Sequence, residues 1–357
     1  MIRLLFIIQS FLILLISCQP YVEPGIISKQ KKNKKEYYER QKGVHVFGSL
    51  DTINIQPLKE TNFNWVTLVP YGDQKDYDSA EFFSHKGDSL RVTRRNNRMI
   101  KWIETAHKNG FKVFVKPHIW LYENTPGKWR SDIYPKNEES WQNWQKDYRQ
   151  FILRYARLAE LSKVEMFCVG TELSRLSTEK TEFWEDLIQD VRKIYGGKIT
   201  YAANWHNEYQ KITFWEDLDY IGIQAYFPLV KNENPSILEI SKGWKKHISA
   251  ISSVHKKYNR PVLFTEMGYK STPDSAIRPW EWIDYEAIDE IKPSNETQAN
   301  CYRAFFDTVW DMEWMAGIHI WQWRSNPGKR RGNKRHLDFT PQGKPAELII
   351  KSEFLTE

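Results

Sequence analysis

The feature that most constrains the fold is a repeated alternation between short apolar runs and longer segments with helical periodicity. The runs are rich in β-branched and aromatic residues, and most of them follow a turn signal. They span residues 43–48, 64–72, 112–120, 164–173, 198–205, 218–227, 261–269 and 317–323. Because runs that are apolar on both faces are typical of covered parallel strands, the pattern predicts eight parallel strands.

Segments with a helical pattern separate these runs. In residues 138–161 the large apolar residues recur at spacings of three and four, which is the stripe of a helix with one buried face. Further helices are predicted at 99–107, 184–194, 237–258 and 297–315. Eight alternating units over about 300 residues predict an α/β fold of the (β/α)8 or TIM-barrel class. We expect the barrel to form one domain at 43–350, with a C-terminal tail at 351–357.

The first 17 residues predict a targeting segment rather than a part of the fold. Arg3 precedes a hydrophobic run that ends just before Cys18, as in a secretory signal peptide. The segment 15–18, Leu-Ile-Ser-Cys, resembles a bacterial lipobox, which implies cleavage before Cys18 and lipidation of its thiol. Residues 18–42 are rich in lysine and lack apolar periodicity, so we expect a flexible basic tether there. The predicted location is the bacterial cell envelope, with a lipid anchor on the periplasmic face of a membrane or at the cell surface.

Composition excludes several classes of protein. With three cysteines, the chain cannot form a disulfide framework or a four-thiolate zinc site. After the N-terminal segment no window approaches about 18 uninterrupted apolar residues, so a multi-span membrane protein is excluded. The net charge of +7 is spread along the chain without nucleic-acid motifs, so we expect no nucleic-acid partner. We expect a monomer.

Two of the predicted strands carry a glutamate near their C-terminal end, Glu172 and Glu266. In a TIM barrel these ends meet at the mouth, where the active site lies. Burying an unpaired carboxylate costs several kcal/mol, so packing alone does not explain the pair, although a salt bridge could explain either residue singly. Two carboxylates in one cavity are the minimum for glycoside hydrolysis, in which one protonates the leaving oxygen and the other attacks the anomeric carbon.

The other predicted strand ends carry aromatic rings and hydrogen-bonding groups. Sugars present apolar C–H faces that stack on aromatic rings, and hydroxyls that need directional partners. The chain has 16 tryptophans, and we expect those on helical stripes to be core residues and those at strand ends to line a cleft. The predicted substrate-binding residues are Lys116, His118, Trp120, Asn204, Trp205, Tyr226, Trp321 and Trp323.

The histidines and cysteines predict no metal site and no nucleophilic thiol. The chain has no H-E-x-x-H motif, and its strand histidines lie on different predicted strands at mixed depths. Cys168 falls within a predicted strand and Cys301 within a predicted helix, so both are expected to be buried packing residues. We expect no cofactor.

The strand-end segments together resemble glycoside hydrolase family 113, a family of clan A known for β-1,4-mannanases. Glutamates on strands four and seven are the hallmark of that clan. The segments that carry the resemblance are KPHIW at 116–120, VGTEL at 169–173, TYAANW at 200–205, FWEDLDYIGIQAYFPL at 214–229, FTEMGY at 264–269 and DFTPQGKPA at 338–346. They span essentially all of residues 43–350.

The resemblance implies a retaining mechanism with Glu172 as general acid/base and Glu266 as nucleophile. Most of the clan has Asn before the acid/base, in contact with the sugar 2-hydroxyl, whereas this chain has Thr171 there and offers Asn204 as a candidate for that contact. Tyr226 would hydrogen-bond the nucleophile. We expect a raised pKa for Glu172, because of partial desolvation and the second carboxylate. Retention predicts that the two carboxyl groups lie about 5–5.5 Å apart.

The resemblance also implies a β-1,4-mannosidic substrate, namely mannan, glucomannan or manno-oligosaccharides. The alternatives are a β-glucan-active hydrolase of the same clan and a non-catalytic glycan-binding lipoprotein on the same barrel. A buried Arg paired with Glu172 would favour the binding protein. The segment 270–293, and Arg324 with the basic stretch 329–335, are candidate walls of the cleft, and they decide between endo and exo action.

Overall fold

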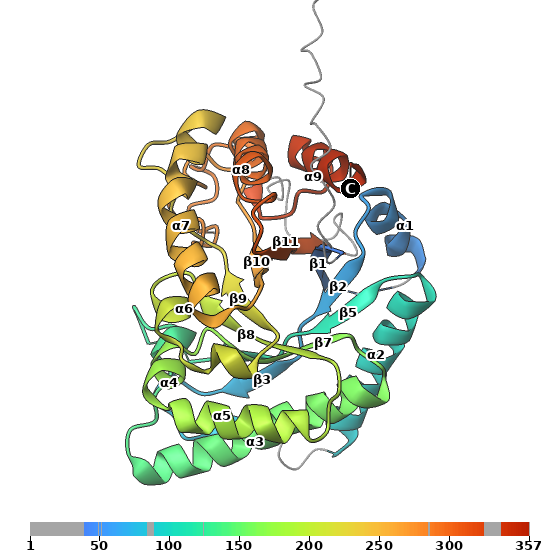
Figure 1. Ribbon diagram of the computed structural model, residues 1–357, viewed down its shortest axis with the longest axis vertical. Helices are drawn as coiled ribbons and strands as arrows, with labels where there is room; N and C mark the ends of the chain where they lie inside the picture. The colour runs from blue at the N-terminus through green and yellow to red at the C-terminus, as the bar shows by residue number, and fades with distance from the viewer. Residues whose placement is uncertain are drawn as a thin grey trace, which may run out of the picture. The chain divides into compact units, whose positions relative to one another are not determined.

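Eight parallel strands close into a barrel in the computed structural model, which describes residues 39–356 apart from 49, 51, 84–88, 124, 285 and 325–336. The strands are β1 (Gln41–Phe47), β2 (Trp65–Leu68), β5 (Lys112–Val115), β7 (Met166–Thr171), β8 (Lys198–Asn204), β9 (Tyr220–Gln224), β10 (Val262–Met267) and β11 (Met315–Arg324). Their order around the barrel is β1-β11-β10-β9-β8-β7-β5-β2 (Figure 1). Each predicted run overlaps one of these strands, which confirms the TIM-barrel prediction. Residues 1–17, Cys18 and the tether up to residue 38 lie outside the described residues.

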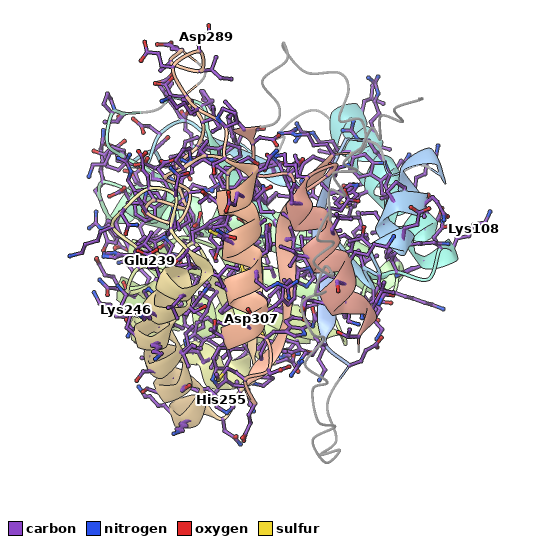
Figure 2. All side chains as sticks on the ribbon, turned by 90° about the horizontal axis from the view of Figure 1, so that it is seen from above. Lys108, Glu239, Lys246, His255, Asp289 and Asp307 are labelled. Carbon is purple, nitrogen blue, oxygen red and sulfur yellow. The ribbon has the colours of Figure 1, made fainter. Side chains whose placement is uncertain are left out.

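Helices cover the outside of the barrel (Figure 1). They are α1 (Thr52–Glu60), α2 (Ser89–Lys108), α3 (Glu138–Leu161), α4 (Ser174–Glu179), α5 (Thr181–Arg192), α6 (Glu208–Lys211), α7 (Ile237–Tyr258), α8 (Asn295–Thr308) and α9 (Pro345–Leu355), with 3-10 turns η1 (Arg130–Asp132) and η2 (Phe214–Asp217). In α7, Ser236 and Glu239 form a capping box at the start, and Asn259 ends the helix at φ 49°. Glu239 and Lys246 lie on its outer face (Figure 2). No helix in the described ranges is long and apolar enough to cross a membrane.

The helix boundaries follow the strength of the sequence pattern. The predictions for α3 and α7 match the structure because both helices have a clear apolar stripe and polar caps. By contrast, α2 begins at Ser89 rather than at residue 99, since its first turns are polar, and α8 ends at Thr308 rather than at 315. The helices α1, α4, α6 and α9 are not among the predictions. Here α4 is six residues long and α1 contains Pro57, features that weaken a helical pattern.

A small second sheet lies beside the barrel and was not predicted. It has the order β4-β3-β6, with β3 (Tyr71–Gln74), β4 (Phe82–Phe83) and β6 (His118–Leu121). The predicted runs 64–72 and 112–120 each divide at a proline, Pro70 and Pro117, so that the first half joins the barrel and the second half joins the small sheet. Proline has no N–H to donate to a ladder, which ends the barrel strands there.

The apolar core has two layers. Within the barrel, Trp65, Phe114, Met166, Cys168, Ala202 and Leu263 form one cluster, and a larger cluster fills the space between strands and helices. Cys168 and Cys301 are both free and buried, which confirms that prediction. Of the tryptophans expected in the core, Trp141 and Trp144 are buried and Trp102 is partly buried. The barrel is therefore a filled scaffold, and its chemistry must lie at one end.

Candidate active site

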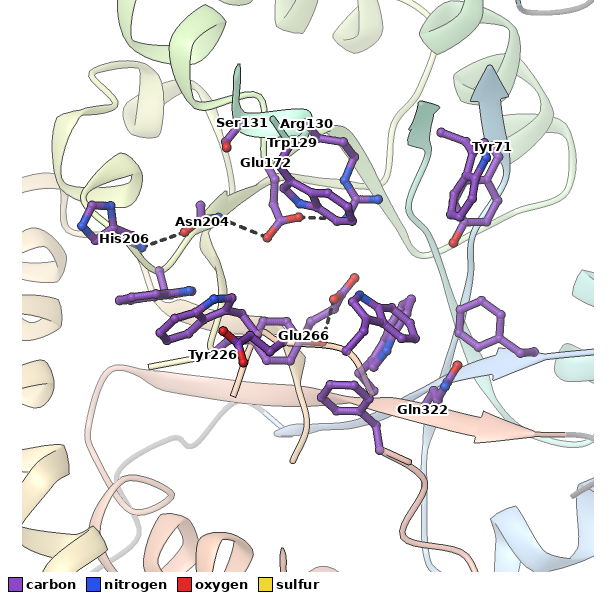
Figure 3. Close-up of a pocket in the computed structure, with 18 of the residues that line it drawn as sticks. Tyr71, Trp129, Arg130, Ser131, Glu172, Asn204, His206, Tyr226, Glu266 and Gln322 are labelled. Atoms are coloured by element: carbon purple, nitrogen blue, oxygen red, sulfur yellow. Dashed lines mark hydrogen bonds and ion pairs between the residues drawn. The ribbon is translucent and has the colours of Figure 1, made fainter. Parts of the chain in front are cut away.

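A cavity of about 1500 Å³ opens at the C-terminal ends of the barrel strands (Figure 3). It exceeds the roughly 300–1,000 Å³ that is typical of small-molecule sites, so it has room for an extended ligand. Glu172 and Glu266 both line it and point into it from opposite sides. The cavity also has an aromatic lining, with Trp120, Trp129, Trp205, Trp280, Trp282 and Trp321 among its residues.

Glu172 directly follows β7 and lies in a strained backbone conformation. Its φ of 54° lies in the left-handed region, which residues other than Gly and Asn seldom adopt. Its N–H donates to the carbonyl of Ala202 at 2.9 Å, which fixes the turn against β8. Its carboxylate accepts hydrogen bonds from Arg130 Nη2 at 3.0 Å and from Asn204 Nδ2 at 3.3 Å. The turn thus aims a buried carboxyl group into the cavity.

Burial is the main cause of a raised pKa at Glu172. Arg130 opposes this shift by favouring the charged form, and the negative charge of Glu266 adds to it. The direction agrees with the expectation, and both expected causes contribute. Arg130 was not foreseen, and its side chain is 14% exposed, so it stands at the cavity wall rather than in the core.

Glu266 lies near the end of β10 in a cradle of donors. Its Oε2 accepts a hydrogen bond from the Tyr226 hydroxyl at 2.9 Å, and its Oε1 accepts one from Lys116 Nζ. Nε2 of His118 lies 3.5 Å from the same Oε1, and Nε2 of His45 lies 3.8 Å from it. All four partners are buried. The cradle therefore fixes the position of Glu266 at the floor of the cavity.

The surroundings of the two histidines in this cradle favour their neutral forms. Burial, and then the positive charge of Lys116, hold the pKa values of His45 and His118 well below the usual range. Burial also lowers the pKa of Lys116, while Glu266 opposes that shift. The described residues contain no group of three or more His, Cys, Asp or Glu side chains arranged to hold a metal ion. The cationic character of the cradle thus comes from Lys116.

The structure brings most of the predicted binding residues to the cavity. Trp120, Asn204, Trp205, Tyr226 and Trp321 line it, and Trp205 stacks on Trp280 with ring centroids 4.8 Å apart. Trp280 and Trp282 come from the predicted wall segment 270–293, and Arg324 from the other predicted wall also lines the cavity. The remainder of that second wall, 329–335, lies outside the described residues.

Three predicted binding residues lie elsewhere. Lys116 and His118 are buried beneath Glu266, so their contacts are with that carboxylate rather than with the open cavity. Trp323 is 2% exposed and packs against Phe63 in the outer core. The cause is a register shift between β1 and β11, in which Val44 pairs with Ile320 but Val46 pairs with Trp323. The extra residue in β11 reverses the alternation of side chains, so Trp321 faces the mouth and Trp323 faces the helices.

Other residues of the site were missed from the sequence. Arg130 lies in η1, inside a loop without periodicity, and no sequence signal marks it. Tyr71 lines the cavity from β3, and its position at the end of the run 64–72 could have identified it. Glu208 contacts the cavity residues Asn204 and Ser174 from behind, and its place shortly after β8 was its only signal.

Comparisons with known proteins identify similar folds and the family of the chain. Two solved structures described as GH113 β-1,4-mannanases align with TM-scores of 0.75 and 0.74 at 24% and 25% identity, and each alignment covers 90% of this chain and 100% of that one. A GH113 β-mannanase from Alicyclobacillus acidocaldarius aligns with a TM-score of 0.72 at 24% identity, over 89% of this chain and 97% of that one. No curated protein matches the chain. The model of Glycoside Hydrolase Family 113 matches residues 46–344, so the chain belongs to this family and is a glycoside hydrolase.

Proposed function

We propose that the chain is a retaining β-1,4-mannanase that uses Glu172 and Glu266 as its catalytic pair. The main support is that the two carboxyl groups face each other across one aromatic-lined cavity, in a member of family 113. The solved structures that support the substrate are described as β-mannanases, at 24–25% identity.

In the first step, Glu172 donates its proton to the glycosidic oxygen while Glu266 attacks the anomeric carbon. The bond between that carbon and the leaving oxygen breaks, and a covalent bond to Glu266 forms. In the second step, Glu172 takes a proton from water, and the water oxygen displaces Glu266. The raised pKa of Glu172 suits the first step, because the acid must be protonated when substrate binds.

Arg130 fits this cycle as a partner of the deprotonated state of Glu172. After the first step Glu172 is a carboxylate, and the guanidinium at 3.0 Å stabilises that charge. Burial and Glu266 favour the protonated state and Arg130 the charged one, so Glu172 can change its protonation during turnover. Arg130 therefore does not by itself favour the non-catalytic alternative.

Sugar units of the substrate stack on the tryptophans of the cavity. Trp120 and Trp282 are about half exposed, at 54% and 50%, which leaves ring faces available for this contact. We assign Asn204 to the 2-hydroxyl of the sugar at the reacting centre, because its amide already lies next to Glu172. Tyr226 orients Glu266 through its hydrogen bond.

The test is hydrolysis of mannohexaose and cellohexaose by the wild-type protein and by Glu266→Ala. We expect cleavage of mannohexaose alone, a loss of activity by orders of magnitude in the variant, and a first-formed product with the β-anomeric proton signal in NMR. Product lengths separate endo from exo action. Cleavage of cellohexaose alone would replace the mannan assignment with a β-glucan one, and a first-formed α-anomer would overturn retention.

The N-terminal segment adds a proposal on location. We infer that the chain is cleaved before Cys18 and anchored by a lipid on this thiol to the bacterial cell envelope. Radiolabelled palmitate should label the wild-type protein and not Cys18→Ser. Equal labelling of both proteins would overturn the lipobox interpretation.

A further inference from the structure

A buried carboxyl group that the mechanism above does not use lies behind Glu172. Glu208, the first residue of α6, is 1% exposed. Its two oxygen atoms accept four hydrogen bonds from uncharged donors. At Oε1 the donors are the hydroxyls of Tyr201 (2.6 Å) and Ser177 (2.7 Å), and at Oε2 they are the Ser174 hydroxyl (2.8 Å) and the Asn204 N–H (2.6 Å).

One pair of these contacts leads to the turn that carries Glu172. The Tyr201 hydroxyl donates to Glu208 and also accepts a hydrogen bond from the N–H of Leu173 at 2.9 Å. Leu173 directly follows Glu172, whose own N–H is bonded to β8. A left-handed residue persists only where its surroundings hold it, and these two bonds hold the backbone on both sides of the strained residue.

The second contact leads to the amide that touches the Glu172 carboxyl. Glu208 Oε2 holds the Asn204 backbone, and Asn204 Oδ1 accepts from the N–H of His206 at 2.8 Å. With its oxygen engaged there, the amide presents Nδ2 to Glu172. Both the backbone and the side chain of Glu172 thus depend on contacts that Glu208 organises.

We propose that Glu208 is a positioning residue for the acid/base step, because it fixes both the turn that carries Glu172 and the amide that contacts its carboxyl group. The inference rests on the proposed role of Glu172 and goes beyond it. Glu208 touches no substrate. A displacement of about 1 Å at a reacting group can lower the rate roughly 100-fold. The loss of the Glu208 contacts should therefore be measurable in the kinetics.

Two variants weaken the support in different ways. In Glu208→Gln one acceptor oxygen becomes an NH2 group. The backbone N–H of Asn204 can only donate, so the remaining oxygen of the substituted side chain must stay in the position of Oε2 to accept from it. The NH2 group then stands in the position of Oε1, where the Tyr201 hydroxyl no longer finds an acceptor. Tyr201→Phe removes the same link and keeps the ring. Ser177→Ala is the matched control, since the Ser177 hydroxyl donates to Glu208 and to the Ser174 carbonyl, whereas the Tyr201 hydroxyl joins Glu208 to the N–H of Leu173.

The test compares two substrates that differ in their need for an acid. The dinitrophenolate group of a dinitrophenyl β-mannobioside leaves without being protonated, whereas the sugar leaving group of a manno-oligosaccharide needs a proton from Glu172. We expect Glu208→Gln and Tyr201→Phe to lower kcat/KM for the oligosaccharide about 10- to 100-fold and for the aryl substrate less than about threefold. Azide should raise kcat of these variants on the aryl substrate. It attacks the anomeric carbon without a general base, breaks the bond to Glu266 and yields the glycosyl azide.

Each other outcome contradicts the inference. An equal loss on both substrates would mean that Glu208 supports only the fold, and no loss on either would mean that the network is dispensable. Thermal melting identifies a variant that fails to fold, in which case the other variant decides. If the wild-type protein cleaves neither substrate, the proposed function itself is wrong, and the role of Glu208 falls with it.

Discussion

At the scale of single residues, the two glutamates of the cavity have different surroundings. Glu172 is buried beside Asn204 and Arg130 and has a raised pKa. Glu266 accepts hydrogen bonds from a lysine and a tyrosine, which are contacts typical of a carboxylate nucleophile. Different surroundings give two carboxyl groups different pKa values, so that one site can hold both a protonated acid and an ionised nucleophile.

The first residue-level prediction concerns Arg130. In Arg130→Met the cation that favours the charged form of Glu172 is lost, so the pKa of Glu172 rises further. Because the acid then stays protonated to higher pH, the alkaline limb of the kcat/KM profile should move to higher pH. Arg130→Lys keeps a positive charge and should move the limb less. A limb that stays in place or moves downward in Arg130→Met would contradict the role given to Arg130.

The second residue-level prediction concerns Lys116. Removal of one partner from a buried ion pair costs about 3–5 kcal/mol, so Lys116→Met should lower the free energy of unfolding by that order. It should also lower kcat at least tenfold, because Glu266 loses a contact that fixes it. Lys112→Met is the control, since Lys112 begins β5, the strand that Lys116 directly follows, but pairs with Glu39 at the surface. Denaturant titration and kinetics measure both effects, and equal results for the two variants would contradict the cradle.

The sequence predicts the two glutamates of the cavity because each follows or ends an apolar strand. Glu172 and Glu266 are recognisable because a charged residue at the end of an apolar strand has no reason in packing. Arg130 and Glu208 come from a 3-10 turn and a four-residue helix, whose positions depend on tertiary contacts. No local pattern encodes that these side chains meet Glu172 and Asn204.

At the scale of elements, small irregularities decide which side chains reach the cavity. The apolar runs predicted every barrel strand, but Pro70 and Pro117 divide two of them and turn their ends into the small sheet. In β11 the register shift against β1 separates Trp321 from Trp323. A period-two reading places both tryptophans on one face, and only the pairing partner reveals the shift.

The prediction at this scale compares these two tryptophans. Trp323→Phe should lower the free energy of unfolding by about 1–3 kcal/mol, because it leaves space in the outer core, and should change kcat/KM less than about twofold. Trp321→Phe should lower kcat/KM about 3- to 10-fold, because Trp321 lines the cavity. Kinetics and denaturant titration of both variants check this. A larger loss of kcat/KM in Trp323→Phe than in Trp321→Phe would contradict the register shift between β1 and β11.

At the scale of the whole molecule, the barrel gathers residues that are distant in sequence at one end. The alternation of strands and helices predicted this architecture, and the known geometry of such barrels predicted the end that carries the cavity. The width of the cavity was not predictable, since it depends on the small sheet and on loops such as the one that carries Trp280 and Trp282.

The stability of the whole molecule should carry a pH signature of Glu208. Burial raises the pKa of Glu208 to about 7 in the folded protein, from a usual value of 4.5. A carboxyl group with a raised folded-state pKa contributes stability that is present below pH 4.5 and is lost as the pH rises through about 7. The melting temperature of Glu208→Gln should therefore approach that of the wild type between pH 5 and pH 8. A difference that does not change over this range would contradict the raised pKa.

The proposed mechanism depends on a covalent bond between Glu266 and the sugar during turnover. The most direct measurement is mass spectrometry of the intact protein and of its peptides after incubation with a dinitrophenyl 2-deoxy-2-fluoro-β-mannobioside. The fluorine slows both steps, and the activated leaving group lets the first step proceed, so the glycosyl-enzyme accumulates. We predict an adduct of one fluorinated mannobiosyl group on the peptide that contains Glu266, and none in Glu266→Ala. An adduct on another residue, or cleavage of mannohexaose without any adduct at Glu266, would contradict the proposed mechanism.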